Sequence, residues 1–397
     1  MASKTSAGRF QHLLLPLFLL FCFGGVFYTY YKPTISWALC SDGAVSSYEV
    51  CLDKCLNAFK ENFTRNLTTI STLNYTLVKQ LPPITSQAVM EENKENHDLD
   101  TIMLIWSWPF GFKFDVKACS PLFGIKGCQI TDDRSQYDKA HGVMFHHRDI
   151  GGDVTNLLNT PRPPHQKWVW MNMESPDNSQ RWTGLDGLFN LTANYRRDSD
   201  VWVPYGRITE ASEKDKTFKI PPKDKLVCWI VSNWNPNFRR VKYFNELIQH
   251  VKVEAYGRHF DRYVSNEDYN KIVQSCKFYL SFESSIHKDY FTEKLFNPMK
   301  IGTVPVVLGP PRENYEDFIP ADSFIHVDDF KSPQELAKHL TFLDQNQEVY
   351  EQYFTWRKHF TAEGAPFGLE HACRSCDYIR NNKGYRVFKN LNKWYWG

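Results

Sequence analysis

The sequence lacks an excess of either charge. Its 397 residues include 47 Lys and Arg against 45 Asp and Glu, which leaves a formal net charge of +2 at pH 7. Proteins that bind nucleic acid neutralise phosphates with many Lys and Arg side chains. We therefore expect no nucleic-acid or other polyanionic partner.

Two further absences bear on how the chain is organised. No internal repeat is evident, and residues 32–98 lack a sustained apolar period while being rich in Ser, Thr and Asn. A stretch of this composition is typical of a tether rather than of a folded domain. We interpret residues 32–98 as a stem.

Charged side chains are also absent between Phe10 and Tyr31, although Lys4 and Arg9 precede this stretch and Lys32 follows it. As a helix it would span roughly 33 Å, about the thickness of one bilayer core. The apolar region of a cleaved signal peptide, the alternative, is shorter, at about 7–15 residues. We predict a transmembrane anchor over 10–31, a cytosolic tail over 1–9 and a lumenal body.

Asparagine sequons and cysteines agree with a lumenal body. Acceptor sequons for N-glycosylation begin at Asn62, Asn66, Asn74 and Asn190. Six of the ten cysteines follow the stem, and an even number suits disulfides, although it leaves their connectivity open. They are Cys119, Cys128, Cys228, Cys276, Cys373 and Cys376. A zinc site or redox motif built on Cys373-x-x-Cys376 remains an alternative.

Short apolar runs recur from Thr101 onward and fall into two series separated by the polar stretch 210–223. Runs of this length between helical or turn segments indicate parallel strands in α/β layers. We predict an α/β fold with two Rossmann-like domains facing a cleft. Their boundaries are 99–212 and 213–360, the second ending in a long amphipathic helical region over 333–360, and a C-terminal tail covers 361–397.

The stretch DYFTEKLFNPMKIGTVPVVLG suggests a nucleotide site in the second domain. It predicts a helix with Asp289 as its N-cap, Glu293 and Lys294 in the first turn, and a strand at 304–308. A cation at this end of a helix is unfavourable unless an anion is bound. A ribose diol on the carboxylate and phosphates on the ammonium would satisfy the pair; a solvated helix start is the alternative.

A second polar segment, VSNWNPNFRRVKYF, has the same character. Ser232 and Asn233 follow a predicted strand, and Arg239 and Arg240 precede an apolar-periodic helix from Val241. Helix N-termini beyond strand ends are common phosphate sites. An unpaired arginine here is otherwise usually a surface charge.

In the first domain, KWVWMNMESP predicts a strand that carries a carboxylate at its tip. Period-2 alternation puts Trp168, Trp170, Asn172 and Glu174 on one face. A single carboxylate suits a base for an acceptor hydroxyl in direct-displacement glycosyl transfer. A structural salt bridge is the alternative role for Glu174.

The run RRDSD offers a competing metal site. Asp198 and Asp200 could hold a divalent cation on a nucleotide diphosphate. Arg196 and Arg197 could instead neutralise both carboxylates.

Together these segments resemble the α-1,3-fucosyltransferases of the secretory pathway, glycosyltransferase family 10. The resemblance covers residues 101–396, whereas the stem matches poorly. It is carried by WPFG, GVMFHHRDI, KWVWMNMESP, YRRDSDVWVPYG, VSNWNPNFRRVKYFNEL, KFYLSFESSIHKDYFTEKL, GTVPVVLGPPRENYEDFIPADSFIHVDDF and HACRSCD.

The resemblance implies a fold of the GT-B type, an inverting transfer from GDP-fucose and no required metal, a divalent cation being at most stimulatory. It makes Glu174 the catalytic base. GDP-fucose would be bound by Arg240, Tyr290, Glu293, Lys294, Ser232 and Asn233. The implied disulfides are Cys119–Cys373, Cys128–Cys376 and Cys228–Cys276.

On the acceptor side the resemblance implies Phe110, Phe112, Arg148 and Tyr205. In this family Arg at position 148 accompanies type 2 chains, so we expect fucose on the 3-hydroxyl of GlcNAc in N-acetyllactosamine, on glycoproteins or glycolipids. Phe112 replaces a family Gln, Ser284 an Asn, Phe291 an Ile and Pro298 an Ala.

The expected location is the Golgi membrane, as a single-pass type II protein, and a homodimer is left open. Two alternatives remain: a same-fold transferase with an altered acceptor, and a membrane-anchored carbohydrate-binding protein without transferase activity.

Overall fold

The computed structural model describes residues 100–151 and 154–397. The predicted tail, anchor and stem, with the sequons at Asn62, Asn66 and Asn74, lie outside the described residues. Within those two ranges, no helix combines the length and apolar character that a bilayer crossing requires.

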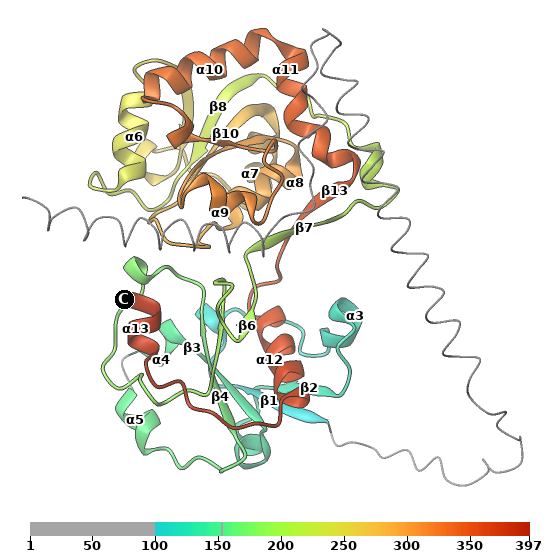
Figure 1. Ribbon diagram of the computed structural model, residues 1–397, viewed down its shortest axis with the longest axis vertical. Helices are drawn as coiled ribbons and strands as arrows, with labels where there is room; N and C mark the ends of the chain where they lie inside the picture. Colours follow the sequence, from blue (N-terminus) through green and yellow to red (C-terminus); the bar gives the residue numbers. More distant parts are fainter. Residues whose placement is uncertain (1–99, 152–153) are drawn as a thin grey trace, which may run out of the picture. The chain divides into compact units, whose positions relative to one another are not determined.

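The first half of the described chain forms a six-stranded sheet with the order β2-β1-β3-β4-β5-β6 (Figure 1). All neighbouring strands run parallel. The strands are β1 (Thr101–Ile105), β2 (Cys128–Thr131), β3 (Gly142–His146), β4 (Lys167–Asn172), β5 (Leu191–Asn194) and β6 (Val201–Trp202).

The second half forms a five-stranded sheet with the order β12-β11-β10-β8-β9, again parallel throughout. The strands are β8 (Lys225–Ile230), β9 (Val253–Tyr256), β10 (Cys276–Phe282), β11 (Val304–Leu308) and β12 (Ile325–His326). The sequence therefore correctly predicts two parallel α/β halves.

Helices cover both faces of each sheet, as parallel sheets require. They are α3 (Cys119–Phe123), α4 (His147–Ile150), α5 (Val154–Asn159), α6 (Arg239–Leu247), α7 (Asn266–Ser275), α8 (Glu293–Ile301), α9 (Arg312–Glu316), α10 (Pro333–Gln345), α11 (Gln347–Glu351), α12 (Leu369–Asn381) and α13 (Leu391–Trp396). The helical region predicted over 333–360 is interrupted at Asn346, between α10 and α11.

Alternation along β4 divides the core of the first sheet. Val169 and Met171 pack on one face with side chains of α12, whereas Trp168 and Trp170 pack on the other with α5 and α13. All four are at most 1% exposed. Helices from the end of the chain thus complete a domain that begins near residue 100.

The chain crosses between the halves twice, and the two crossings pair with each other. β7 (Gly206–Glu210) leaves the first half and β13 (Phe360–Gly364) returns to it, in an antiparallel pair. Figure 1 shows the two strands side by side. The C-terminal tail then continues into α12 and α13.

Disulfides fix this return of the chain. Cys119–Cys373 joins α3 to α12, and Cys128–Cys376 joins β2 to α12. The structure thus contains these two implied bridges, so none of the four thiols is free to bind zinc, and Cys373 and Cys376 do not pair with each other.

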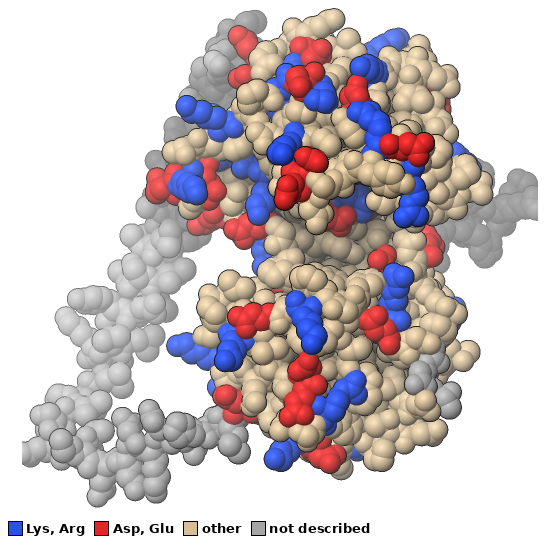
Figure 2. All heavy atoms as spheres, turned by 180° about the vertical axis from the view of Figure 1, so that it is seen from behind, with Lys and Arg blue, Asp and Glu red and all other residues tan. Residues whose placement is uncertain are grey.

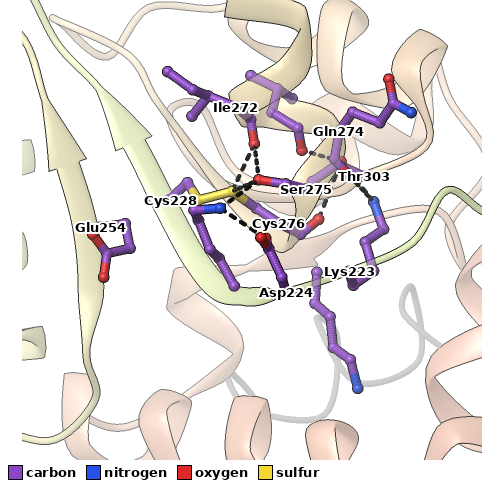
Figure 3. Close-up of a disulfide and its surroundings, with 12 residues drawn as sticks. Lys223, Asp224, Cys228, Glu254, Ile272, Gln274, Ser275, Cys276 and Thr303 are labelled. Atoms are coloured by element: carbon purple, nitrogen blue, oxygen red, sulfur yellow. Dashed lines mark hydrogen bonds and ion pairs between the residues drawn. A yellow bond between two sulfur atoms is a disulfide. The ribbon is translucent and has the colours of Figure 1, made fainter.

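The third implied bridge, Cys228–Cys276, links the neighbouring strands β8 and β10 (Figure 3). Polar contacts surround it: Ser275 Oγ donates to Ile272 O at 2.8 Å, and Lys223 Nζ donates to Thr303 Oγ1 at 3.0 Å. The bridge therefore lies in a region that is also fixed by hydrogen bonds.

The predicted glycan at Asn190 does not fit this structure. Asn190 has no exposed surface, its Oδ1 accepts from Trp168 N at 2.7 Å, and its Nδ2 donates to Arg386 O at 2.6 Å. A glycan on Nδ2 would require the chain around Arg386 to move away.

We expect Cys119→Ala/Cys373→Ala to destabilise the folded body by about 3 kcal/mol, because with Cys128–Cys376 still in place this bridge closes a loop of roughly 14 residues. The thermal unfolding midpoint of the double variant should fall relative to wild type. An unchanged midpoint would show that the Cys128–Cys376 bridge and the packing of α12 are enough to hold the tail.

Candidate functional site

Each sheet reverses its strand order at one point. The reversal lies between β1 and β3 in the first sheet and between β8 and β10 in the second. Ligands of open α/β sheets bind beyond the carboxyl ends of the strands at such points. The topology therefore predicts a ligand site at the segments that follow these four strands.

A cavity of about 940 Å³ lies where these segments meet. Every predicted nucleotide-binding and acceptor-binding residue except Phe112 lines it, together with Glu174. The predicted residues on its wall are Phe110, Arg148, Glu174, Tyr205, Ser232, Asn233, Arg240, Tyr290, Glu293 and Lys294. Phe112 is 59% exposed and is not part of the lining.

Lys294 lies at the start of α8, as predicted, but the helix cap differs from the prediction. Thr292 is the N-cap, and its side chain accepts from Lys294 N. Asp289 instead has a φ of 62° and accepts from Arg197 N at 3.0 Å and from Asn314 Nδ2 at 2.8 Å. The Asp289 carboxylate therefore binds Arg197 and Asn314 instead of capping the helix.

A buried carboxylate that the sequence reasoning missed holds Lys294 in place. Glu283 directly follows β10, is 2% exposed and accepts from Thr292 N at 2.7 Å. Lys294 Nζ lies 3.5 Å from Glu283 Oε2 and 3.2 Å from Glu293 Oε1. The available signal in the sequence was the position of Glu283, directly after one predicted strand and shortly before the predicted helix that carries Lys294.

The two carboxylates keep Lys294 charged. Burial favours the neutral amine, but Glu283 and Glu293 outweigh it and raise the pKa of Lys294 above its ordinary value of 10.5. Burial in turn raises the pKa of Glu283 above 4.5, with Lys294 opposing the shift. The ammonium is thus a fixed positive charge on the cavity wall.

Arg240 is the second cation of this wall, in the first turn of α6. It is 3% exposed, and its guanidinium donates to Asn233 O, after β8, and lies 3.4 Å from Phe282 O, at the end of β10. No carboxylate of the described residues lies within ion-pair distance of it. A buried cation without a counter-ion is costly, so an anionic ligand would stabilise it.

Glu174 faces the cavity from the first half, two residues beyond the end of β4. Burial raises the pKa of its carboxyl above the ordinary value of 4.5, while Lys294 and Arg148 act in the opposite direction. A carboxylate whose pKa is raised in this way is a better proton acceptor. It lines the same cavity as the two cations, which lie at the starts of α6 and α8.

Phe110 and Arg148 form the wall next to Glu174. Phe110 has a φ of 55°, its amide donates to Asp149 Oδ2 at 2.9 Å, and the Arg148 guanidinium lies 5.1 Å from its ring. Tyr205 also lines the cavity, but its hydroxyl donates to Met173 O. Its hydroxyl is therefore engaged by the protein rather than directed at a ligand.

Polar contacts join the two walls beside the cavity. Asn178 Nδ2 donates to Ser284 Oγ at 2.9 Å, and Ser285 Oγ donates to Ser175 Oγ at 2.6 Å. Asn178 and Ser284 both line the cavity, and neither contact was foreseen from the sequence. The serine at 284, a departure from the family pattern, thus has a partner across the gap.

The alternative metal site loses both of its ligands to arginines. Asp198 accepts from Arg196 Nε at 2.9 Å and Nη2 at 2.7 Å, and Asp200 pairs with Arg386. Across residues 100–151 and 154–397 no three His, Cys, Asp or Glu side chains cluster as metal ligands.

The face of the molecule that Figure 2 shows carries no large patch of one charge. On the face that Figure 2 shows, Lys and Arg side chains alternate with Asp and Glu rather than forming a field of one sign. This agrees with the near-balance of charges in the whole sequence.

Comparisons with known proteins agree on one family. The model "Glycosyltransferase family 10 (fucosyltransferase) C-term" matches residues 220–394, and "Fucosyltransferase, N-terminal" matches residues 98–206. The chain is 45% identical over 394 residues to the Homo sapiens protein 4-galactosyl-N-acetylglucosaminide 3-alpha-L-fucosyltransferase 9, covering 99% of each chain. Its Bos taurus counterpart is 54% identical over 297 residues, which cover 75% of this chain and 82% of that protein.

A solved structure, "Crystal Structure of alpha1,3-Fucosyltransferase with GDP-fucose", is 16% identical with a TM-score of 0.47. It covers 74% of this chain and 93% of that chain.

We expect Lys294→Met to raise the dissociation constant for GDP at least tenfold, or by about 1.4 kcal/mol, because a charge-assisted contact to the diphosphate is lost. Calorimetric titration of the soluble body measures this. Lys300→Met, in the exposed last turn of the same helix, is the matched control and should bind GDP normally. Equal affinity in both variants would count against the diphosphate role.

Proposed function

The chain belongs to glycosyltransferase family 10, the fucosyltransferases, and we propose that it transfers L-fucose from GDP-fucose to the 3-hydroxyl of GlcNAc in type 2 N-acetyllactosamine. One observation carries the proposal: Glu174 and the two cations Arg240 and Lys294 line the same cavity from different halves of the chain. The acceptor is the substrate class in the names of the relatives.

The reaction we propose is a single displacement with inversion. The acceptor oxygen attacks C1 of fucose while Glu174 takes the hydroxyl proton, and the bond from C1 to the GDP oxygen breaks on the opposite face. Proton transfer to a positioned base contributes about 10²–10⁴-fold to such a step. The products are the fucosylated glycan and GDP.

Arg240 and Lys294 would stabilise the departing diphosphate. Negative charge grows on GDP as the bond breaks, and fixed cations in a site shielded from water stabilise that charge most in the transition state. Glu293, exposed to the cavity beside Lys294, would bind the guanosine ribose, with Ser232, Asn233 and Tyr290 completing the donor wall. These cations supply the charge for which many transferases use a metal, so we propose that no divalent cation is required.

Phe110 and Arg148 would form the acceptor wall, since they adjoin Glu174. The guanidinium of Arg148 next to an aromatic face suits a sugar that presents both hydroxyls and an apolar side. We further propose a single-pass type II protein of the Golgi membrane with a lumenal body. The predicted anchor over 10–31 supports this from the sequence.

We expect Glu174→Gln to bind GDP normally but to lose at least 10²-fold in transfer, because the amide accepts no proton. The assay measures the release of GDP from GDP-fucose under three conditions: with lactosamine, with a type 1 acceptor, and without an acceptor. Each condition is repeated in the presence of EDTA. Transfer to lactosamine that persists in EDTA supports the proposal. A body that binds glycans but never releases GDP would support the carbohydrate-binding alternative, and a preference for the type 1 acceptor would support an altered acceptor.

The same base assignment predicts a pH dependence. Glu174 acts deprotonated, so kcat/KM should fall as the pH drops through its folded pKa, which burial places above 4.5. Arg148→Met removes a cation that lowers the pKa of Glu174, so the fall in kcat/KM at low pH should begin at a higher pH. Arg258→Met, at an exposed position, is the control and should leave the pH profile unchanged. A pH profile that is the same in Arg148→Met as in wild type would contradict the assignment of Glu174 as the base.

A further inference from the structure

Three consecutive carbonyl groups at and beyond the end of β4 each accept a hydrogen bond from a side chain. Asn194 Nδ2 donates to Asn172 O, Tyr205 OH to Met173 O and Tyr395 OH to Glu174 O. The donors come from β5, from the segment before β7 and from α13. Three parts of the chain thus converge on the segment that carries Glu174.

The amide of Glu174 is held as well. It donates to Asn172 Oδ1 at 3.2 Å, and Asn172 Nδ2 donates onward to Ser179 Oγ at 2.9 Å. Both backbone polar groups of Glu174 are therefore bonded to side chains. The strand ladder has ended at Asn172, so these side chains replace it in fixing the backbone.

Tyr395 reaches this segment because α13 is firmly packed. The tyrosine is 2% exposed, and its ring lies 4.9 Å from that of Trp170 and 4.8 Å from that of Trp396. Trp396 Nε1 donates to Ser179 O at 3.0 Å, on the same loop as Glu174. The last turn of the chain is thus part of the support of this loop.

We propose that Tyr395 and Tyr205 are positioning residues for the general base, their hydroxyls fixing the backbone of residues 173 and 174 and hence the direction of the Glu174 carboxylate. This rests on the proposed function in so far as Glu174 is the base. A base must come within about 2.6–3.2 Å of the hydroxyl it deprotonates. Displacement by about 1 Å can cost roughly 10²-fold in rate.

The role belongs to the hydroxyl and not to the ring. Tyr395→Phe keeps the aromatic packing on Trp170 and removes only the donor to Glu174 O. Tyr350 offers a matched control: it is fully buried, its hydroxyl donates to Lys277 O at 3.2 Å, and it does not line the cavity. Tyr350→Phe therefore deletes the same kind of bond elsewhere in the fold.

The test compares Tyr395→Phe, Tyr205→Phe and Tyr350→Phe in the soluble lumenal body. For each, kcat and KM for GDP-fucose are measured per GDP-binding site counted by titration, together with the unfolding midpoint. We expect Tyr395→Phe and Tyr205→Phe to lose at least tenfold in kcat, with KM for GDP-fucose unchanged within twofold. Tyr350→Phe should lower the unfolding midpoint and keep wild-type kcat.

Two outcomes would overturn the proposal: wild-type kcat in both Tyr395→Phe and Tyr205→Phe, or an equal loss of kcat in Tyr350→Phe. If Tyr395→Phe does not fold, Tyr205→Phe alone decides. Glu174→Gln separates this proposal from the proposed function. An active Glu174→Gln refutes the base itself, whereas an inactive Glu174→Gln beside fully active Phe variants refutes only the positioning.

Discussion

Arg240 lies buried at the start of α6 and spans the ends of β8 and β10, with backbone carbonyls as its hydrogen-bond partners. A guanidinium stays protonated in proteins, so an anion would stabilise a buried one. The positive end of the helix dipole would stabilise the same anion. Lys294, at the start of α8, differs because it already pairs with two carboxylates, which keep it charged. Arg240 has no carboxylate partner among the described residues, and a nucleoside diphosphate would supply the anion.

The first half contributes a carboxylate, Glu174, which in the proposed reaction has to point at the acceptor hydroxyl. Burial raises the pKa of Glu174, and its backbone is held on both sides. Contacts from Asn178 and Ser175 to the loop at 284–285 join its segment to the donor wall. In the proposed reaction, the distance between the base and the leaving group would therefore depend on these polar contacts as well as on the two sheets.

Much of this could be predicted from the sequence, because strands and their faces follow local rules. Period-2 alternation from Trp168 placed Glu174 at a strand tip, and the position of Lys294 in a helix start pointed to an anion. What failed depended on distant partners. Asp289 was a sound N-cap by composition, yet Arg197 and Asn314 hold it and Thr292 caps the helix. Tyr395 is 221 residues from Glu174 in sequence, and no local pattern reveals such a contact.

The return of α12 and α13 to the first sheet has a consequence for the order in which the chain is made. Domains generally fold as units as they emerge during synthesis. Here α12 and α13, which cover parts of the two faces of the β1–β6 sheet, are translated only after the whole second half. Apolar side chains of the first sheet that pack on these two helices therefore stay partly uncovered until residues 369–396 have been translated. The bridges Cys119–Cys373 and Cys128–Cys376 likewise form only after Cys373 and Cys376 have been translated.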